Sequence, residues 1–411
     1  WPMLPKTEVE AACISCHTGV MEVPRADKLN AARNLFAELG CMGCHATDGF
    51  LDLRKVGPSL AHIAGKVDAD WMRKWIENPK SFDAHARMPR FFGLSSAPVS
   101  ARQQAVVGSI TAYLRDKSKP LELHPVPVAG DPARGAELAR KVGCLGCHSV
   151  GKFTANDFGP NLDGTGSKLT MPWLYAWLKD PKKMFPETKM PDLRLSDQEA
   201  ADIASYLLTL KNPKFDAEPA PQVQPAALDA LVLEELRKKQ TAKDAEAQMA
   251  GMDEKQKELL VGRAKIAHYG CFGCHDIPGF EDAKNVGTEL TEEGSKPVGR
   301  FDFGFVPIEH TRGAFFRQKL KDPRSFDMGK VKTGGEKLKM PQFDLTPEQI
   351  ELLSLHLTSL VKHTVPLDRR KILSPDEQWA EKGRKIVRNF NCQGCHVMDG
   401  KGGNIADTLE D

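Results

Sequence analysis

Every cysteine of the chain belongs to one short pattern, in which two residues separate two cysteines and a histidine directly follows the second. The pattern occurs five times and uses all 10 cysteines of the protein. Numbered 1 to 5 in chain order, the motifs are Cys13, Cys16 and His17; Cys41, Cys44 and His45; Cys144, Cys147 and His148; Cys271, Cys274 and His275; and Cys392, Cys395 and His396. Cysteine pairs of this spacing occur as disulfides, as half of a zinc site, as redox-active dithiols and as cofactor anchors.

The histidine after each pair favours the cofactor anchor, because C-x-x-C-H is the attachment signature of c-type haem. Two thiols at this spacing can form thioethers to the two vinyl groups of one porphyrin, and the adjacent imidazole can bind the iron. A structural zinc site usually takes four ligands, and isolated pairs with one histidine each do not combine into such sites. A thioredoxin-like dithiol needs no adjacent histidine. We therefore expect five covalent haem c groups, called haem 1 to haem 5, with the five motif histidines as iron ligands.

A methionine followed by proline recurs downstream of three motifs. Met88 follows motif 2, Met190 follows motif 3 and Met340 follows motif 4. Most methionines are ordinary core residues, but matched positions favour the role of distal iron ligand. A thioether opposite an imidazole raises the reduction potential of the iron relative to ligation by two histidines. An iron with both axial positions filled transfers electrons readily and binds substrates poorly, which favours an electron carrier over an enzyme.

The residues between these sites predict helices throughout. An amphipathic segment precedes each of motifs 2 to 5, and three later segments end at a proline, which cannot continue a helix. A last helix follows each Met-Pro step and begins with a capping box, in which a hydroxyl residue is followed three positions later by Gln or Glu. The expected capping residues are Ser100, Ser196 and Thr346. The sequence thus predicts an all-α fold of tandem helical units, each built around a haem that enlarges a small apolar core.

The repeat also predicts where the units begin and end. The expected segments are 1–26, a partial haem-binding segment; 27–125, 126–212 and 255–366, the units of haems 2, 3 and 4; 213–254, a Pro-rich and charged linker; and 367–411, an incomplete unit of haem 5.

Composition narrows the partners and the compartment. The 411 residues carry a formal net charge of +2, which gives no reason to expect nucleic-acid binding. No stretch approaches the roughly 20 apolar residues of a membrane span. The sequence opens on Trp1 without a signal peptide, so we expect a processed or partial form. Because haem c is attached outside the cytoplasm, we expect a periplasmic or other extracytoplasmic protein.

The units of haems 2 and 3 also carry a Gly-Pro-x-Leu element. Together with the C-x-x-C-H and Met-Pro elements, it makes the units of haems 2, 3 and 4 resemble class I cytochrome c domains in tandem. Pro58 and Pro160 occupy the proline of the Gly-Pro-x-Leu element. In that family the proline carbonyl accepts a hydrogen bond from the proximal histidine, which fixes the imidazole ring. The resemblance implies that Pro58 orients His45. It likewise implies that Pro160 orients His148, while Thr288 takes this place in the unit of haem 4.

The chain is also similar to large multihaem cytochromes c of bacterial respiratory chains. This similarity implies single-electron transfer along the haems between redox proteins, and association with a membrane-bound quinol-oxidising complex or a larger cytochrome assembly. A haem enzyme of the peroxidase or nitrite reductase type is the alternative. Pentahaem nitrite reductases replace one motif histidine by lysine, whereas all five motifs here keep histidine.

The distal ligands of haems 1 and 5 stay open at this point, and an open iron at either would suit an enzyme. Met3, Met21 or a histidine from elsewhere could serve haem 1, with Met3 favoured. No Met-Pro step follows His396, so the ligand of haem 5 would lie beyond Asp411 or on another chain.

Overall fold

The computed structural model describes residues 4, 6, 8–17, 20, 22–50, 55–94, 100–151, 158–186, 188–330, 337–362, 365–398 and 400–402. These residues form helices joined by loops, with one two-stranded ladder in which β1 (Val397–Met398) pairs antiparallel with β2 (Lys401–Gly402). The expectation of an all-α fold is confirmed. No helix of the described residues is long and apolar enough to cross a bilayer.

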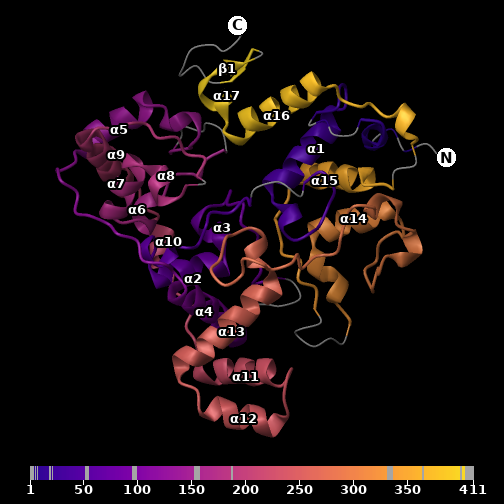
Figure 1. Ribbon diagram of the computed structural model, residues 1–411. Helices are drawn as coiled ribbons and strands as arrows, with labels where there is room; N and C mark the ends of the chain where they lie inside the picture. Colours follow the sequence, from indigo (N-terminus) through magenta and orange to yellow (C-terminus); the bar gives the residue numbers. More distant parts are fainter. Residues whose placement is uncertain are drawn as a thin grey trace.

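Six helices pack in three pairs that form the frame of the molecule (Figure 1). They are α1 (Asp27–Glu38) with α15 (Pro347–Ser359), α13 (Glu254–Tyr269) with α4 (Ala101–Asp116), and α5 (Pro132–Lys141) with α9 (Asp197–Thr209). Only the last pair comes from one expected unit. The units expected at 27–125 and 255–366 exchange their partners, because the first helix of each packs on the last helix of the other. Chain order therefore does not give the packing of these two units.

The described residues form eleven further helices. They are α2 (Ala69–Glu77), α3 (Pro79–Phe82), α6 (Thr165–Lys168), α7 (Met171–Lys179), α8 (Pro181–Met184), α10 (Pro213–Ala217), α11 (Pro225–Leu236), α12 (Ala242–Ala250), α14 (Arg312–Lys321), α16 (Pro375–Asn389) and α17 (Cys392–Cys395). Short 3-10 turns include η1 (Val9–Ser15), η2 (Cys41–Gly43), η4 (Cys144–Gly146) and η5 (Cys271–Gly273). The capping boxes of α9 and α15 are complete, whereas at α4 Ser100 accepts from the backbone of Gln103 without the reciprocal bond.

A small residue nine positions before the first motif cysteine lets each helix pair approach closely. A methyl group added at Gly135 on α5 would overlap the carbonyl oxygen of Asp202, and one at Gly262 on α13 would overlap that of Ser109. Ala32 occupies the same place on α1 and is completely buried. The helix crossings thus depend on backbone contact that larger side chains would prevent.

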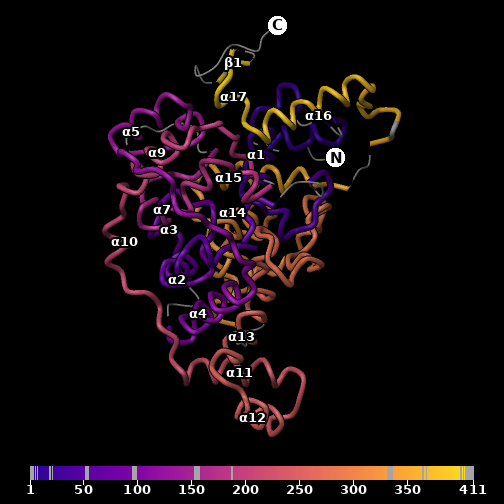
Figure 2. The backbone as a smooth tube through the Cα atoms, turned by 60° about the vertical axis from the view of Figure 1, so that its left-hand side comes forward, coloured from indigo at the N-terminus to yellow at the C-terminus, as the bar shows by residue number. Residues whose placement is uncertain are grey.

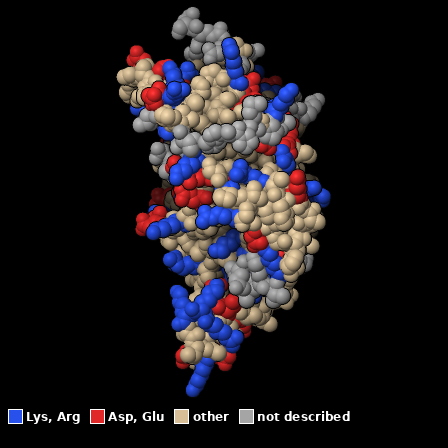
Figure 3. Space-filling view, turned by 90° about the vertical axis from the view of Figure 1, so that its right-hand side faces the viewer, with Lys and Arg blue, Asp and Glu red and all other residues tan. Residues whose placement is uncertain are grey.

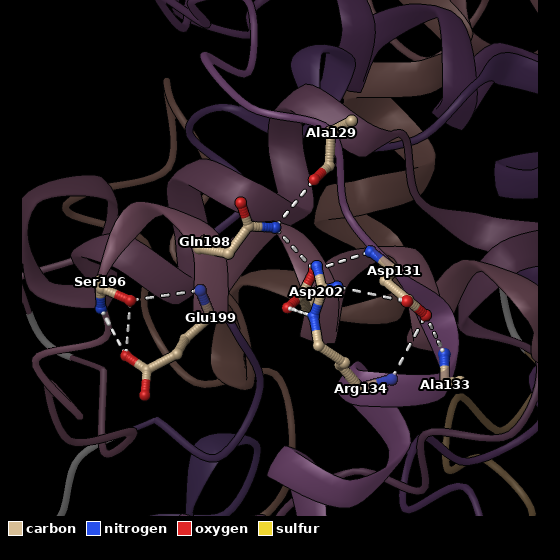
Figure 4. A network of polar contacts seen from close by, with 8 residues as sticks. All are labelled: Ala129, Asp131, Ala133, Arg134, Ser196, Gln198, Glu199 and Asp202. Atoms are coloured by element: carbon tan, nitrogen blue, oxygen red, sulfur yellow. Dashed lines mark hydrogen bonds and ion pairs between the residues drawn. The ribbon is translucent and has the colours of Figure 1, made fainter.

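The α5 and α9 pair is also joined by a buried carboxylate (Figure 4). Asp202 is only 2% exposed and accepts hydrogen bonds from the Arg134 guanidinium at 2.8 and 3.0 Å. It also accepts from the backbone N–H of Asp131 at 2.7 Å and from the Gln198 amide at 2.9 Å. These charge-assisted bonds satisfy the carboxylate that α9 buries, and they hold the first turn of α5 against it.

The expected linker at 213–254 is structured instead. α11 buries Leu228, Leu231 and Val232 against α4 and α13, and Phe215 on α10 belongs to the same core. The tube in Figure 2 places α11 and α12 at the narrow end of the molecule, next to α4 and α13. The prediction of a solvated linker was wrong for α10 and α11, because the apolar run within "AALDALVLEEL" completes a neighbouring core, whereas α12 buries only Ala245. Positive and negative side chains are interspersed over the face in Figure 3, in agreement with a net charge near zero.

Candidate haem sites

Four of the five motifs begin at a left-handed residue that ends the preceding helix. These residues are Gly40 (φ 71°), Gly143 (φ 91°), Gly270 (φ 71°) and Asn391 (φ 52°). Glycine and asparagine tolerate this conformation, and the reversal turns the chain from the helix into the short turn that carries both cysteines. Motif 1 differs, because its first cysteine lies within η1. No two of the ten cysteines form a disulfide, so the disulfide alternative does not describe this structure.

Motif 3 shows the arrangement within a single unit. The Nδ1 atom of His148 lies 2.8 Å from the Pro160 carbonyl oxygen, the contact that the family resemblance implies. The backbone N–H of Gly159 donates to the Cys147 carbonyl at 2.7 Å, which holds this loop against the motif. Burial lowers the pKa of His148. A neutral ring that donates its Nδ1–H to a carbonyl leaves Nε2 free as a metal ligand.

Motifs 2 and 4 show the same contacts, but with each other's loops. His275 Nδ1 lies 2.8 Å from the Pro58 carbonyl, and His45 Nδ1 lies 2.7 Å from the Thr288 carbonyl. Pro58 therefore orients His275, and the expectation that it orients His45 was wrong. The backbone agrees, since Gly57 donates to Cys274 at 2.9 Å and Gly287 donates to Cys44 at 2.8 Å. Burial lowers the pKa of both imidazoles, as in motif 3.

Motif 1 is completed by a segment that sequence reasoning missed. The backbone N–H of Lys371 donates to the Cys16 carbonyl at 2.9 Å, the same type of bond that the loop glycines make at motifs 2, 3 and 4. Leu373 packs in the same cluster as Cys13 and Ile14. The segment "RKILS" carries no Gly-Pro-x-Leu pattern, so nothing in the sequence marked it. Met3 and Met21, considered as ligands of haem 1, lie outside the described residues.

Motif 5 lies beside motif 3. The Asn391 amide donates to Cys147 Sγ at 3.4 Å, and a methyl group added at Gly394 would lie 2.7 Å from the Gly146 carbonyl. α16, which leads into motif 5, keeps Trp379 and Ile386 exposed, and Phe390 directly after this helix is exposed as well. The role of His396 as iron ligand stays a prediction, as does that of His17.

Motifs 2 and 4 meet in the same way, back to back through glycine. A methyl group added at Gly43 would overlap the Gly273 carbonyl, and one at Gly273 would overlap that of Gly43. The third residue of the motif is glycine in motifs 2 to 5, whereas motif 1 has Ser15. The four glycine motifs thus form two pairs, 2 with 4 and 3 with 5, and each pair brings two attachment sites into contact.

The cavity beside motifs 2 and 4 suits a large apolar group with carboxylates. The cavity also reaches the loops at motifs 3 and 5 and has a total volume of about 2550 Å³. Its lining includes Cys41, Cys44, His45, Cys271, Cys274, His275, Met88 and Met340. Trp71 also lines it, and the indole N–H of this residue is buried without a partner among the described residues. This free donor and the lysines described next would meet the propionates of a porphyrin, so the residues fit haem c.

The units of haems 2 and 3 each place a lysine, at equivalent positions, over a tryptophan ring of the other unit. Lys66 Nζ lies 4.6 Å from the ring centre of Trp173, and Lys168 Nζ lies 4.7 Å from that of Trp71. Burial is the main cause that lowers the pKa of Lys66 to about 7 and that of Lys168 to about 8. Both lysines line the cavity, where a positive charge stabilises the reduced state of a nearby redox centre.

Replacing Lys66 with methionine should lower at least one haem reduction potential at pH 6, below the pKa of about 7, because the substitution removes a positive charge from the cavity wall while keeping the side-chain length. A potentiometric titration followed by haem absorbance measures this shift. Lys141→Met is the matched control, since that side chain is 74% exposed, and its titration curve should equal that of the unmodified protein. Unchanged potentials in Lys66→Met would contradict the placement of this charge near a haem.

Two of the methionines expected as distal ligands accept a hydrogen bond from a tryptophan that lies at the same position in each unit. The Trp75 indole N–H donates to Met88 Sδ at 3.0 Å, and the Trp177 indole N–H donates to Met190 Sδ at 2.9 Å. Met340 packs in the cluster that contains Cys41. The tryptophans were missed by sequence reasoning, although "DWMRKW" and "PWLYAW" place them identically in the two units. The assignment of the three methionines to iron stays a prediction.

Paired cysteines followed by an oriented histidine, on an all-α frame, define a c-type cytochrome. Comparison with known proteins agrees: the cytochrome c family model matches residues 132–211, and the model of cytochrome c554 and c-prime matches residues 3–46. The chain belongs to the cytochrome c family. It binds haem c and carries electrons between redox partners, as members of this family do.

Individual relatives match about a fifth of the chain. Cytochrome c of Ginkgo biloba is 36% identical over 100 residues, which are 19% of this chain and 87% of the relative. Cytochrome c of Gossypium barbadense is 32% identical over 97 residues, which are 18% of this chain and 86% of the relative. A nitric oxide reductase subunit of Stutzerimonas stutzeri is 34% identical over 79 residues, which are 18% of this chain and 54% of that relative. No solved structure gave a significant match.

Proposed function

We propose that the chain is a pentahaem c-type cytochrome that passes single electrons along its haems between respiratory redox partners. The observation that carries this proposal is the back-to-back contact of motif 2 with motif 4 and of motif 3 with motif 5. Attachment sites in contact would place bound haems within short electron-transfer distance of each other. A single redox site on a soluble carrier needs no such pairing.

The residues of the chain support this role by holding each site rigid. When bound, haem c supplies an iron that changes oxidation state by one electron. The carbonyls of Pro160, Pro58 and Thr288 fix the imidazoles of the three motifs in the described units. The methionines would bind the iron together with the histidines, so that neither oxidation state binds a substrate. Fixed ligands on both sides keep the structural change on electron transfer small.

The partners are proposed from chemistry and from one relative. We place the protein in the periplasm or another extracytoplasmic compartment, where haem c is attached, and in association with a membrane-bound quinol-oxidising complex or a larger cytochrome assembly. The similarity to a nitric oxide reductase subunit supports a partnership with a larger reductase, and the match spans about half of that relative.

Counting haems and electrons on the purified protein tests the proposal. Intact-mass measurement should give five haems on each chain. A reductive titration should then take up five electrons per chain, and the reduced protein should be reoxidised stoichiometrically by a small c-type cytochrome. Fewer than five covalent haems would contradict the pentahaem proposal. Steady turnover of nitrite or hydrogen peroxide would instead favour the enzyme alternative, at haem 1 or haem 5.

A further inference from the structure

From the exchange of loops and helices we infer that haems 2 and 4 also exchange their distal ligands. Met340 would bind the iron of the haem held by Cys41 and Cys44, and Met88 that of the haem held by Cys271 and Cys274. This inference rests on the proposed haem binding, and it differs from the pairing that chain order suggests.

The unit of haem 3 gives the reference arrangement, because all its parts come from one stretch of chain. α5 packs on α9, His148 contacts the Pro160 carbonyl, and Met190 accepts the indole N–H of Trp177. Leu138 and Val142, which precede the motif, lie in the same apolar cluster as Met190. A complete site therefore has its helix pair, its histidine-orienting carbonyl and its methionine around one cluster.

The same set around motif 4 comes from the N-terminal half of the chain. α13 packs on α4, and His275 contacts the Pro58 carbonyl. Trp75, which donates to Met88, packs in the cluster that contains Cys271. The rings of Phe91 and Phe92, just after Met88, each lie 5.5 Å from the ring of Tyr269, just before motif 4.

The helix partner, the histidine-orienting carbonyl and the methionine around motif 2 come from the C-terminal half. α1 packs on α15, and His45 contacts the Thr288 carbonyl. Met340 lies in the cluster formed around Phe36 and Leu353, together with Cys41. Met340 thus shares the cluster of motif 2, and Met88 is joined to the cluster of motif 4 through Trp75.

Each loop passes from its own motif to the other motif at a glycine. Val56 still packs against Gly40, but one residue later a methyl group added at Gly57 would lie 2.5 Å from the ring of His275. Val286 likewise packs against Gly270, while a methyl group added at Gly287 would lie 2.7 Å from the ring of His45. Only residues without a side chain fit where each loop passes under the other motif's imidazole.

The two methionine segments are also joined directly. Arg90 and Gln342, each two residues after its methionine, exchange backbone hydrogen bonds of 2.8 Å in an antiparallel bridge. The Arg90 guanidinium donates to the Asp344 carboxylate at 2.7 and 2.6 Å. Both distal segments therefore form one connected unit, in which a change at either methionine is close to both sites.

Mapping the haem that each methionine protects tests the inference on the holoprotein. Met88→Ala opens one iron, which hydrogen peroxide then bleaches selectively, and digestion followed by mass spectrometry identifies the motif peptide that has lost its haem. We expect loss at Cys271 and Cys274 for Met88→Ala, and at Cys41 and Cys44 for Met340→Ala. Met190→Ala is the matched control and should lose the haem of motif 3. The reverse mapping for Met88 and Met340 would overturn the exchange while leaving haem binding intact.

A second measurement avoids dependence on bleaching. In a variant with Cys271 and Cys274 both replaced by alanine, haem 4 is absent, and magnetic circular dichroism counts the remaining His/Met haems. Adding Met88→Ala should then leave this count unchanged, whereas adding Met340→Ala should reduce it by one. The opposite result contradicts the exchange. A protein without any covalent haem would instead contradict the proposed function.

Discussion

Replacing Gly273 with valine is expected to destabilise the protein by about 3 kcal/mol, the upper part of the range for overpacking a tight contact. Even a methyl group at this position would overlap the carbonyl oxygen of Gly43, and backbone cannot move aside as a flexible side chain can. The substitution would push motifs 2 and 4 apart. Denaturant unfolding followed by helical circular dichroism measures the loss.

The same variant should also slow electron exchange between the two haems that these motifs hold, which pulse reduction with time-resolved absorbance would detect. Gly299→Val is the matched control, because no atom lies within 4 Å of the space that a side chain there would enter. If Gly273→Val were as stable as that control, the back-to-back contact of the motifs would be refuted.

Replacing Asp202 with asparagine is expected to cost about 2–3 kcal/mol of stability in the unit of haem 3, the range for losing charge-assisted hydrogen bonds at a buried group. Asparagine keeps the shape but removes the charge that the Arg134 guanidinium and the Asp131 N–H stabilise. Urea unfolding of this variant at pH 7 measures the change. Glu137→Gln is the control, since its pair with Lys141 is exposed and spans 3.9 Å.

The pH dependence of stability gives an independent check on Asp202. Its hydrogen bonds, first that from Arg134, lower its pKa to about 2, below the roughly 3.9 of an unfolded aspartate. The unfolded chain therefore binds this proton first as the pH falls. The contribution of Asp202 is present above about pH 4 and is lost towards pH 2, and the Asn variant should lack this part of the acid transition. A variant that retains it would place the titrating group elsewhere.

Local features of the fold could be read from the sequence because they depend on neighbouring residues. The capping boxes at Ser196 and Thr346, the helices before the motifs and the contact of His148 with Pro160 all lie within short stretches of chain. Their causes are hydrogen bonds and turns that a few residues determine. They are found where the residue pattern placed them.

The exchange between the two halves could not be predicted in this way. The loop carrying Pro58 has the pattern needed to orient an imidazole, and nothing in that pattern distinguishes His45 from His275. The choice depends on contacts between residues far apart in the chain, such as that of Gly43 with Gly273. The role of Lys371 at motif 1 could not be predicted either. Its contact uses the backbone N–H, which nearly every residue has, so the residue type gives no signal. Long-range packing decided these features, and a repeated motif offers several equivalent partners.

The most direct test of the electron-carrier function is a redox titration of the purified holoprotein, followed by electron paramagnetic resonance and magnetic circular dichroism. These methods report the number, spin state and axial ligand class of the haems together. We predict five low-spin haems, at least three of them with a methionine ligand, that titrate without binding added cyanide. A persistent five-coordinate, high-spin haem that binds cyanide or peroxide would contradict a pure electron carrier and would indicate catalysis at that site.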